Sequence, residues 1–288
     1  MSAAVAAEPP FRRVCIAGVG LIGGSIARRA RRTWPAMALT GVDRAAIRDS
    51  PDAAELFHHR APPDRLAAVA AVCDLTILAT PVPAIVAEAA ALRDVTSLVT
   101  DAGSTKRSVM AAMQAAGVRR FAGGHPMAGS ERSGLAHAHA DLFSARRWFL
   151  VHGSADAEDE RRLEAFVMGL GAEPVWIDAD AHDRAMAFVS HLPQVVAVAL
   201  HNAAAAALGS QMHATSGRAF FEMTRIAASA PDIWEGIIAT NADHVSDAIA
   251  GLLRELPGGD AALGDGAWVR EAFARAAAVA PPAHKDQA

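Results

Sequence analysis

The chain has 288 residues, a length that suits two domains or one large one. Apolar residues make up 52% and charged residues 20%, the balance of an ordinary globular protein. The formal net charge is −4 and no basic stripe is visible, which argues against nucleic acid as a partner. The longest late apolar stretch, residues 195–208, is too short to span a bilayer. We therefore expect a cytoplasmic protein that does not bind or span a membrane.

Short apolar runs alternate with amphipathic segments through the first 180 residues. Strands of this length, separated by helical stretches, predict a Rossmann-like, doubly wound and mostly parallel α/β sheet. The expected strands lie at 14–18, 38–43, 74–81, 97–103, 119–126, 146–153 and 174–178. Residues 1–10 read as a disordered lead.

From about residue 180 only helical patterns remain. The expected helices are 181–209, 217–229, 231–255 and 266–279, followed by a disordered tail at 281–288. Pro193 must disturb the first of them, since it lacks an N–H. Ser229 with Asp232 forms a start signal close to a capping box. We divide the chain into a nucleotide domain at 1–179 and an all-helical dimerisation domain at 180–288. The second is too thin to form its own core, which predicts a homodimer.

A glycine-rich turn follows the first expected strand. It reads Gly18-Val19-Gly20-Leu21-Ile22-Gly23 and opens a helix, with Asp43 twenty residues beyond Gly23 at the end of a second strand. Such glycines allow a tight turn, close approach of a pyrophosphate and close helix–strand packing. Asp43 would accept hydrogen bonds from ribose hydroxyls and repel a phosphate there, which favours NAD over NADP. Arg44 is the reason for caution, because arginine at this position sometimes receives that phosphate.

Three further segments reach the carboxyl edge of the expected sheet, where ligands bind in such folds. They are Ala79-Thr80-Pro81, the run Asp101–Lys106 and Gly124-His125-Pro126. We place Thr80, Pro81 and Asp101 beside the cofactor. His125 stands in a loop of small residues and titrates near neutral pH, so it suits the part of a general base.

Taken together, these segments resemble the prephenate/arogenate dehydrogenase (TyrA) family. The pattern D-x-G-S-x-K, followed about twenty residues later by H-P-M-x-G-S-E-x-S-G, is highly specific to it. Later matches are Ser190-His191-Leu192-Pro193 and Met223-Thr224-Arg225, with Trp234 nine residues further on. The resemblance spans about residues 14 to 240.

The resemblance implies how the reaction runs. The family histidine, here His125, accepts a hydrogen bond from the hydroxyl of a cyclohexadienyl substrate while the carbon below it releases hydride to the nicotinamide. Loss of carbon dioxide then makes the ring aromatic. By the same resemblance Ser104 orients the hydroxyl and Arg225 anchors a carboxylate. The further substrate-side residues are Gln194, His191, Ser130 and Glu131.

Several alternatives stay open. Gln194 stands where many members carry histidine, so prephenate and arogenate both remain possible substrates. Arg218 departs from a glycine-rich run and is either a carboxylate contact or solvated. Arg225 could instead pair with Glu222, and His191 is about as easily a core histidine as a ligand contact. We expect no metal, because His58-His59 and His137-x-His139 have no third ligand at a recognised spacing.

Two rivals lie outside this family. A β-hydroxyacid dehydrogenase generally uses a lysine on the first long helix after the nucleotide domain, and no lysine lies between residues 107 and 284. A dinucleotide-sensing dimer would bind NAD and catalyse nothing.

Overall fold

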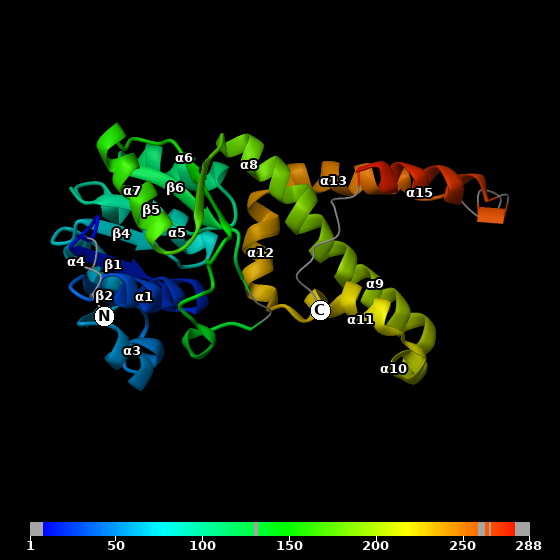
Figure 1. Ribbon diagram of the computed structural model, residues 1–288, viewed down its shortest axis with the longest axis horizontal. Coiled ribbons are helices and arrows are strands. Elements are labelled where there is room, and N and C mark those ends of the chain that lie inside the picture. The colour runs from blue at the N-terminus through cyan, green and yellow to red at the C-terminus, as the bar shows by residue number, and fades with distance from the viewer. Residues whose placement is uncertain (1–7, 130–131, 259–262, 265, 280–288) are drawn as a thin grey trace, which may run out of the picture.

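The computed structural model describes residues 8–129, 132–258, 263–264 and 266–279. One sheet of eight strands forms the first part of the chain, and helices form the rest (Figure 1). The strands are β1 (Arg13–Ala17), β2 (Ala38–Val42), β3 (His59–Ala61), β4 (Leu75–Leu78), β5 (Leu98–Asp101), β6 (Phe121–Pro126), β7 (Arg147–Val151) and β8 (Glu173–Trp176).

The sheet has the order β3-β2-β1-β4-β5-β6-β7-β8, and its strands are parallel except for the antiparallel pair β6–β7. The expectation of a doubly wound, mostly parallel sheet is confirmed. Strand β3 was missed, because a polar three-residue edge strand carries no hydrophobic signal.

Helices cover both faces of this sheet. They are α1 (Leu21–Thr33), α2 (Ala45–Arg48), α3 (Pro51–Leu56), η1 (Pro63–Arg65), α4 (Leu66–Ala70), α5 (Val82–Glu88), η2 (Ala89–Leu92), α6 (Arg107–Ala116), η3 (Leu135–His137) and α7 (Ala157–Gly169). Strand β1 shows why two layers form. Val14 and Ile16 join the apolar cluster under α1, α3 and α7, whereas Cys15 and Ala17 join the one under α4, α5 and α6. A central strand buried on both faces needs this continuous apolar run.

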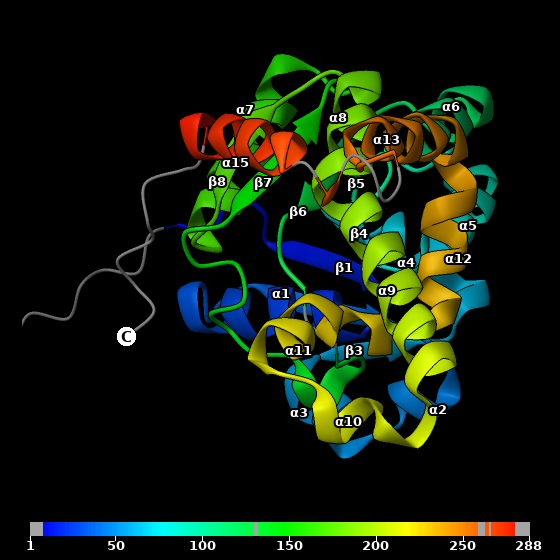
Figure 2. The same cartoon turned by 90° about the vertical axis from the view of Figure 1, so that its right-hand side faces the viewer.

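The helical part begins at Ala179, separated by two residues from the end of the last strand at Trp176. Its elements are α8 (Ala179–Met186), η4 (Ala187–His191), α9 (Leu192–Leu208), η5 (Gly209–Gln211), α10 (Met212–Thr215), α11 (Arg218–Thr224), η6 (Arg225–Ala228), α12 (Pro231–Thr240), α13 (Ala242–Glu255) and α15 (Ala267–Val279). Helix α12 packs on α5, where Gly236 lies against the ring of Pro83. Figure 2 shows α9 and α12 standing in front of the sheet.

Two details of the expected helices were wrong. The helix expected at 231–255 is two helices, because Asn241 adopts φ −137° and buries its side chain between them. The capping box does not form: the Ser229 hydroxyl donates to Ile226 O, and Ala230 precedes α12 without a side-chain cap. Pro193 does disturb the helix, as expected: the π-helical turn η4 lies directly before α9, whose first turn holds this proline.

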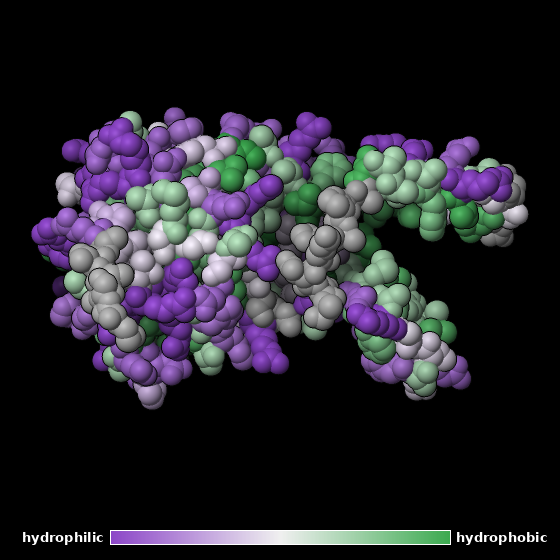
Figure 3. Space-filling model, viewed as in Figure 1, coloured by the Kyte–Doolittle hydropathy of each residue, from purple (hydrophilic) through white to green (hydrophobic). Residues whose placement is uncertain are grey.

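The helices α8 to α10 run on continuously as Ala179–Thr215, much longer than the apolar stretch expected at 195–208. By length and composition alone this run is able to cross a membrane, and 11% of its most apolar window is buried. Figure 3 shows hydrophobic surface on two arms of the helical part, one holding α9 to α11 and the other holding α13 and α15.

Candidate active site

A cleft of about 670 Å³ lies between the carboxyl edge of the sheet and the helices α9, η6 and α12. It brings together residues from both parts of the chain. Those singled out from the sequence that line it are Gly20, Leu21, Ile22, Thr80, Pro81, Ser104, His125, Gln194 and Arg225. His125 and Arg225, about a hundred residues apart in sequence, therefore share one cavity.

The glycine turn at one end of the cleft fits a dinucleotide. Gly18 has φ +88°, and a Cβ there would come within 2.6 Å of the Ala79–Thr80 backbone. A Cβ on Gly23 would lie 2.0 Å from Gly18 O, whereas one on Gly20 would meet nothing within 4 Å. Gly20 precedes helix α1 as its N-cap and provides no side-chain cap, so the first N–H groups of the helix are open to an anion.

Asp43 lies beside this turn and helps to shape it. Its Oδ2 accepts the Val19 N–H at 2.6 Å and its Oδ1 accepts the Arg44 N–H at 2.6 Å. The carboxylate is only partly buried and keeps lone pairs for a ligand. Arg44 itself is exposed.

His125, near the end of β6, is the member of a buried chain of hydrogen bonds that faces the cleft. Its Nδ1 lies 2.9 Å from His182 Nε2, and His182 Nδ1 lies 2.8 Å from Asp183 Oδ1. His182 and Asp183 are fully buried on α8, while His125 keeps 8% of its surface exposed in the cleft. We call these three residues the relay.

The relay fixes the proton positions of His125. An ionised carboxylate only accepts, so His182 Nδ1 carries the proton and its Nε2 is an acceptor. His125 must therefore donate from Nδ1, which leaves Nε2 with a free lone pair. A histidine in this tautomer takes a proton from a ligand hydroxyl.

The electrostatics agree with this assignment. Burial, followed by the nearby charges of His182, Lys106 and His191, lowers the pKa of His125 well below its ordinary value. Burial alone would raise the pKa of Asp183. Hydrogen bonds from His182 and from the Arg107 and Lys106 amides outweigh it and bring that pKa below normal. His125 therefore stays neutral, and Asp183, at the far end of the relay, stays ionised.

Asp101 does not lie beside the cofactor groove as expected. It is fully buried and pairs with Lys106, and it also accepts the N–H groups of Gly103 at 2.8 Å and Gly124 at 3.0 Å. Lys106 donates in turn to Gly124 O at 2.6 Å. The strand end points this carboxylate inward, so the pair holds the loop before His125 and takes no part in the cleft lining.

His191 also differs from its expected position. It is 1% exposed and does not line the cleft. Its Nδ1 lies 3.2 Å from Asn241 Nδ2, which also donates to Asp183 O at 2.7 Å. Burial lowers the pKa of His191 to about 4. It is thus a packed histidine behind the cleft wall, and its Nε2 is buried with no hydrogen-bond partner.

The remaining substrate-side residues fall into two groups. Gln194 donates from Nε2 to Ile226 O at 2.9 Å and faces the cleft. Arg218 is 91% exposed, pairs with Glu222 at 2.6 Å and lies outside the cleft lining, so Glu222 is engaged by Arg218. Ser130 and Glu131 lie outside the described residues.

Sequence reasoning missed several members of the site. His182 and Asp183 were not singled out, because nothing local in the sequence connects this pair on α8 with His125. Trp234 lines the cleft, and so does the exposed Arg132. Ser190 lines it as well.

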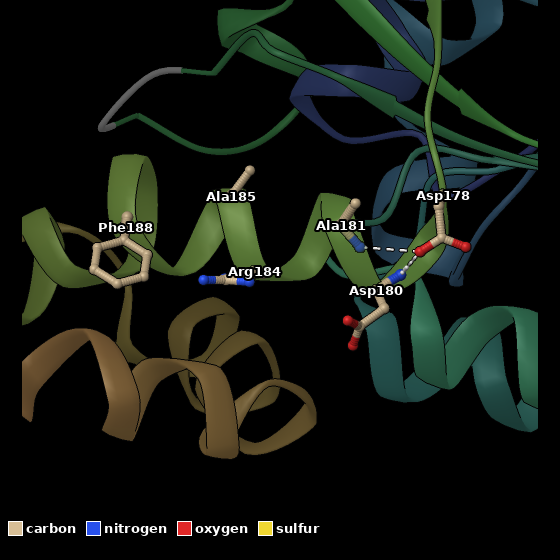
Figure 4. Close-up of a pocket in the computed structure, with 6 residues that line it drawn as sticks. All are labelled: Asp178, Asp180, Ala181, Arg184, Ala185 and Phe188. Atoms are coloured by element: carbon tan, nitrogen blue, oxygen red, sulfur yellow. Dashed lines mark hydrogen bonds between the residues drawn. The ribbon is translucent and has the colours of Figure 1, made fainter.

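A second hollow, of about 490 Å³, lies on the outside of α8 (Figure 4). Its polar groups already serve the fold: Asp178 accepts the N–H groups of Asp180 and Ala181 and so caps the helix. Asp180 also bonds His244 at 2.9 Å. Within the described ranges no three His, Cys, Asp or Glu side chains form a metal-binding group, and Cys15 and Cys73 are buried and free.

The sheet, the glycine turn and the histidine of the cleft define a nucleotide-dependent dehydrogenase with a second, helical domain. Comparison with known families makes this specific. The model for the nucleotide-binding domain of prephenate dehydrogenase matches residues 26–175, and the model for its dimerization domain matches residues 178–270. The chain belongs to the prephenate dehydrogenase family.

Individual relatives agree. A prephenate dehydrogenase of Bacillus subtilis is 33% identical over 258 residues, which are 84% of this chain and 68% of that protein. A cyclohexadienyl dehydrogenase of Zymomonas mobilis is 29% identical, covering 81% of this chain and 82% of its own. The crystal structure of a prephenate dehydrogenase from Aquifex aeolicus, in complex with hydroxyphenyl propionate and NAD+, has a TM-score of 0.79 and 25% identity. The match covers 93% of this chain and 92% of that one.

Proposed function

We propose that this protein catalyses the NAD-dependent oxidative decarboxylation of prephenate to 4-hydroxyphenylpyruvate, a step of tyrosine synthesis. The observation that carries the proposal is the cleft itself. His125, with an unprotonated Nε2, shares this cavity with Ser104, Arg225 and the glycine turn. Membership of the family supports the same substrate.

Each residue then has a distinct task. His125 Nε2 takes the proton of the ring hydroxyl, a contribution of roughly two to four orders of magnitude in rate. Ser104 bonds the same hydroxyl, and the Arg225 guanidinium holds a carboxylate. Gly18, Gly20, Gly23 and Asp43 hold NAD, with Thr80 and Pro81 beside it, and the chemistry NAD supplies when bound is acceptance of a hydride. The apolar walls from Ile233, Trp234 and Ile237 exclude water.

A second candidate is the oxidation of arogenate to tyrosine. Since Gln194 Nε2 is tied to Ile226 O, the group that its amide leaves for a ligand is chiefly the carbonyl oxygen, an acceptor. An acceptor suits the amino group of arogenate better than the keto group of prephenate.

One assay separates the two. NADH formation by the purified protein is measured at 340 nm with each substrate and with NAD+ or NADP+. We expect the larger kcat/KM with prephenate and NAD+. A preference above tenfold for arogenate overturns the first proposal, and no turnover with either substrate leaves only a dinucleotide-binding protein.

We also propose a homodimer assembled through helices, located in the cytoplasm, with the two domains dividing at residues 179 and 180. Among the residues that the structure describes, nearly all large exposed hydrophobic side chains belong to the helical part, and Val72 and Met168 are the two in the sheet domain. Such a patch marks an interaction surface. Sedimentation at micromolar concentration should give twice the chain mass, and a monomer would refute the homodimer.

A further inference from the structure

A glutamate outside the cleft lining is connected directly to the glycine turn. Glu88, at the end of α5, is partly buried and accepts the Thr80 hydroxyl hydrogen bond at 3.0 Å. Thr80 lines the cleft, and its backbone nitrogen would be 2.6 Å from a Cβ on Gly18. Glu88 is therefore one hydrogen bond away from the backbone that packs against the turn.

Asp43 borders the same turn through Val19, the next residue along. The two carboxylates are close enough to interact. Burial raises the pKa of Glu88 to about 6; the Thr80 hydrogen bond opposes this shift and the charge of Asp43 adds to it. Above pH 7 Glu88 is ionised. The segment Gly18–Val19 then lies between this charge and the Asp43 carboxylate.

Nothing in the proposed chemistry uses Glu88. Glu88 does not line the cleft. A hydrogen bond from Thr80 alone does not explain a partly buried carboxylate, since desolvation of the charge is costly. The adenosine end of a bound dinucleotide lies next to Asp43 in this fold. A carboxylate near Asp43 therefore repels any negatively charged group that this ribose carries.

We propose that Glu88 is a second determinant of cofactor selectivity, which acts with Asp43 to exclude the 2′-phosphate of NADP. The inference rests on the proposed use of a nicotinamide dinucleotide. NAD carries only uncharged hydroxyls at this ribose, so the charge of Glu88 affects its binding little. NADP adds a phosphate of nearly two negative charges, which both carboxylates repel. Arg44, exposed beside Asp43, is thereby prevented from recruiting that phosphate.

The test is the affinity for each cofactor, measured by calorimetry at pH 8 without substrate. Glu88→Gln keeps the shape and an acceptor for Thr80 while it removes the charge. We expect this variant to bind NADP+ about tenfold more tightly and NAD+ within threefold of the wild type. Asp43→Asn should weaken NAD+ and tighten NADP+, because it loses the ribose contact as well as the charge.

Glu173→Gln, an exposed glutamate of β8, is the matched control for net charge. The proposal is overturned if Glu88→Gln tightens NADP+ no more than this control, or if it changes both cofactors equally. Should Glu88→Gln melt well below the wild type, Glu88→Met supplies the same neutral test. Because the binding assay contains no substrate, its failure is distinguishable from a failure to oxidise prephenate.

Discussion

His182 offers the sharpest test of the relay, because it touches His125 and is expected to touch no ligand. In His182→Phe the His125 Nδ1–H loses its acceptor inside a buried site. An unsatisfied buried N–H costs about 1–3 kcal/mol. His125 escapes this cost by moving its proton to Nε2, which faces the cleft, and that tautomer cannot accept the substrate proton.

At about 1.4 kcal/mol per factor of ten, this cost predicts a fall in kcat of roughly 5- to 150-fold. KM for prephenate and the Kd for NAD+ should stay within about threefold, since neither ligand is expected to contact His182. The assay is steady-state NADH formation, combined with calorimetry of NAD+ binding and a thermal melt. His182→Gln should recover much of the rate, because an amide can donate to Asp183 and accept from His125.

His59→Phe, an exposed histidine of β3, controls for the substitution itself. The reasoning is refuted if His182→Phe keeps kcat within twofold of the wild type while it remains folded. It is equally refuted if the Gln and Phe variants are slowed to the same extent, since only one of them restores the acceptor.

Three further outcomes follow from particular contacts. Asp183→Asn should lower the free energy of unfolding by about 2–4 kcal/mol in a urea titration, because its amide N–H₂ opposes the Lys106 and Arg107 amides at 2.7 and 2.9 Å; an unchanged midpoint contradicts this. Gly20→Ala should melt like the wild type and bind NAD+ at least about tenfold more weakly, because its Cβ meets no protein atom and projects where the pyrophosphate approaches. His191, whose pKa falls to about 4 in the folded protein, contributes stability that is complete above pH 6.5 and is lost as the pH drops towards 4. The loss is about 3 kcal/mol, and a His191→Gln variant whose stability falls as steeply over this range would show that another group is responsible.

Much of the nucleotide site was readable from the sequence because its parts are contiguous. The glycine turn, Asp43 and the loop carrying His125 each depend on neighbours within a few positions, and local rules describe such neighbours well. Asp101 misled for a physical reason. The end of strand β5 does lie at the ligand-binding edge of the sheet. The Asp101 side chain there, however, pairs with Lys106, five residues later.

The relay and the helix break were out of reach for the opposite reason. His125 and His182 are 57 residues apart and belong to different layers, so no local pattern joins them. Asn241 reads as an ordinary residue in an apolar helix until Asp183 and His191 are placed beside it. Tertiary contacts of this kind override helix propensity.

The base of this enzyme lies on strand β6, while the group that keeps its proton on the correct nitrogen lies on α8, the first helix beyond the sheet. A chimera that grafts a foreign helical half onto this sheet would therefore inherit a competent nucleotide site and a misprotonated imidazole. Only donors that carry their own His-Asp pair at that first helix would give a working hybrid, so the two halves are free to exchange only as a matched set.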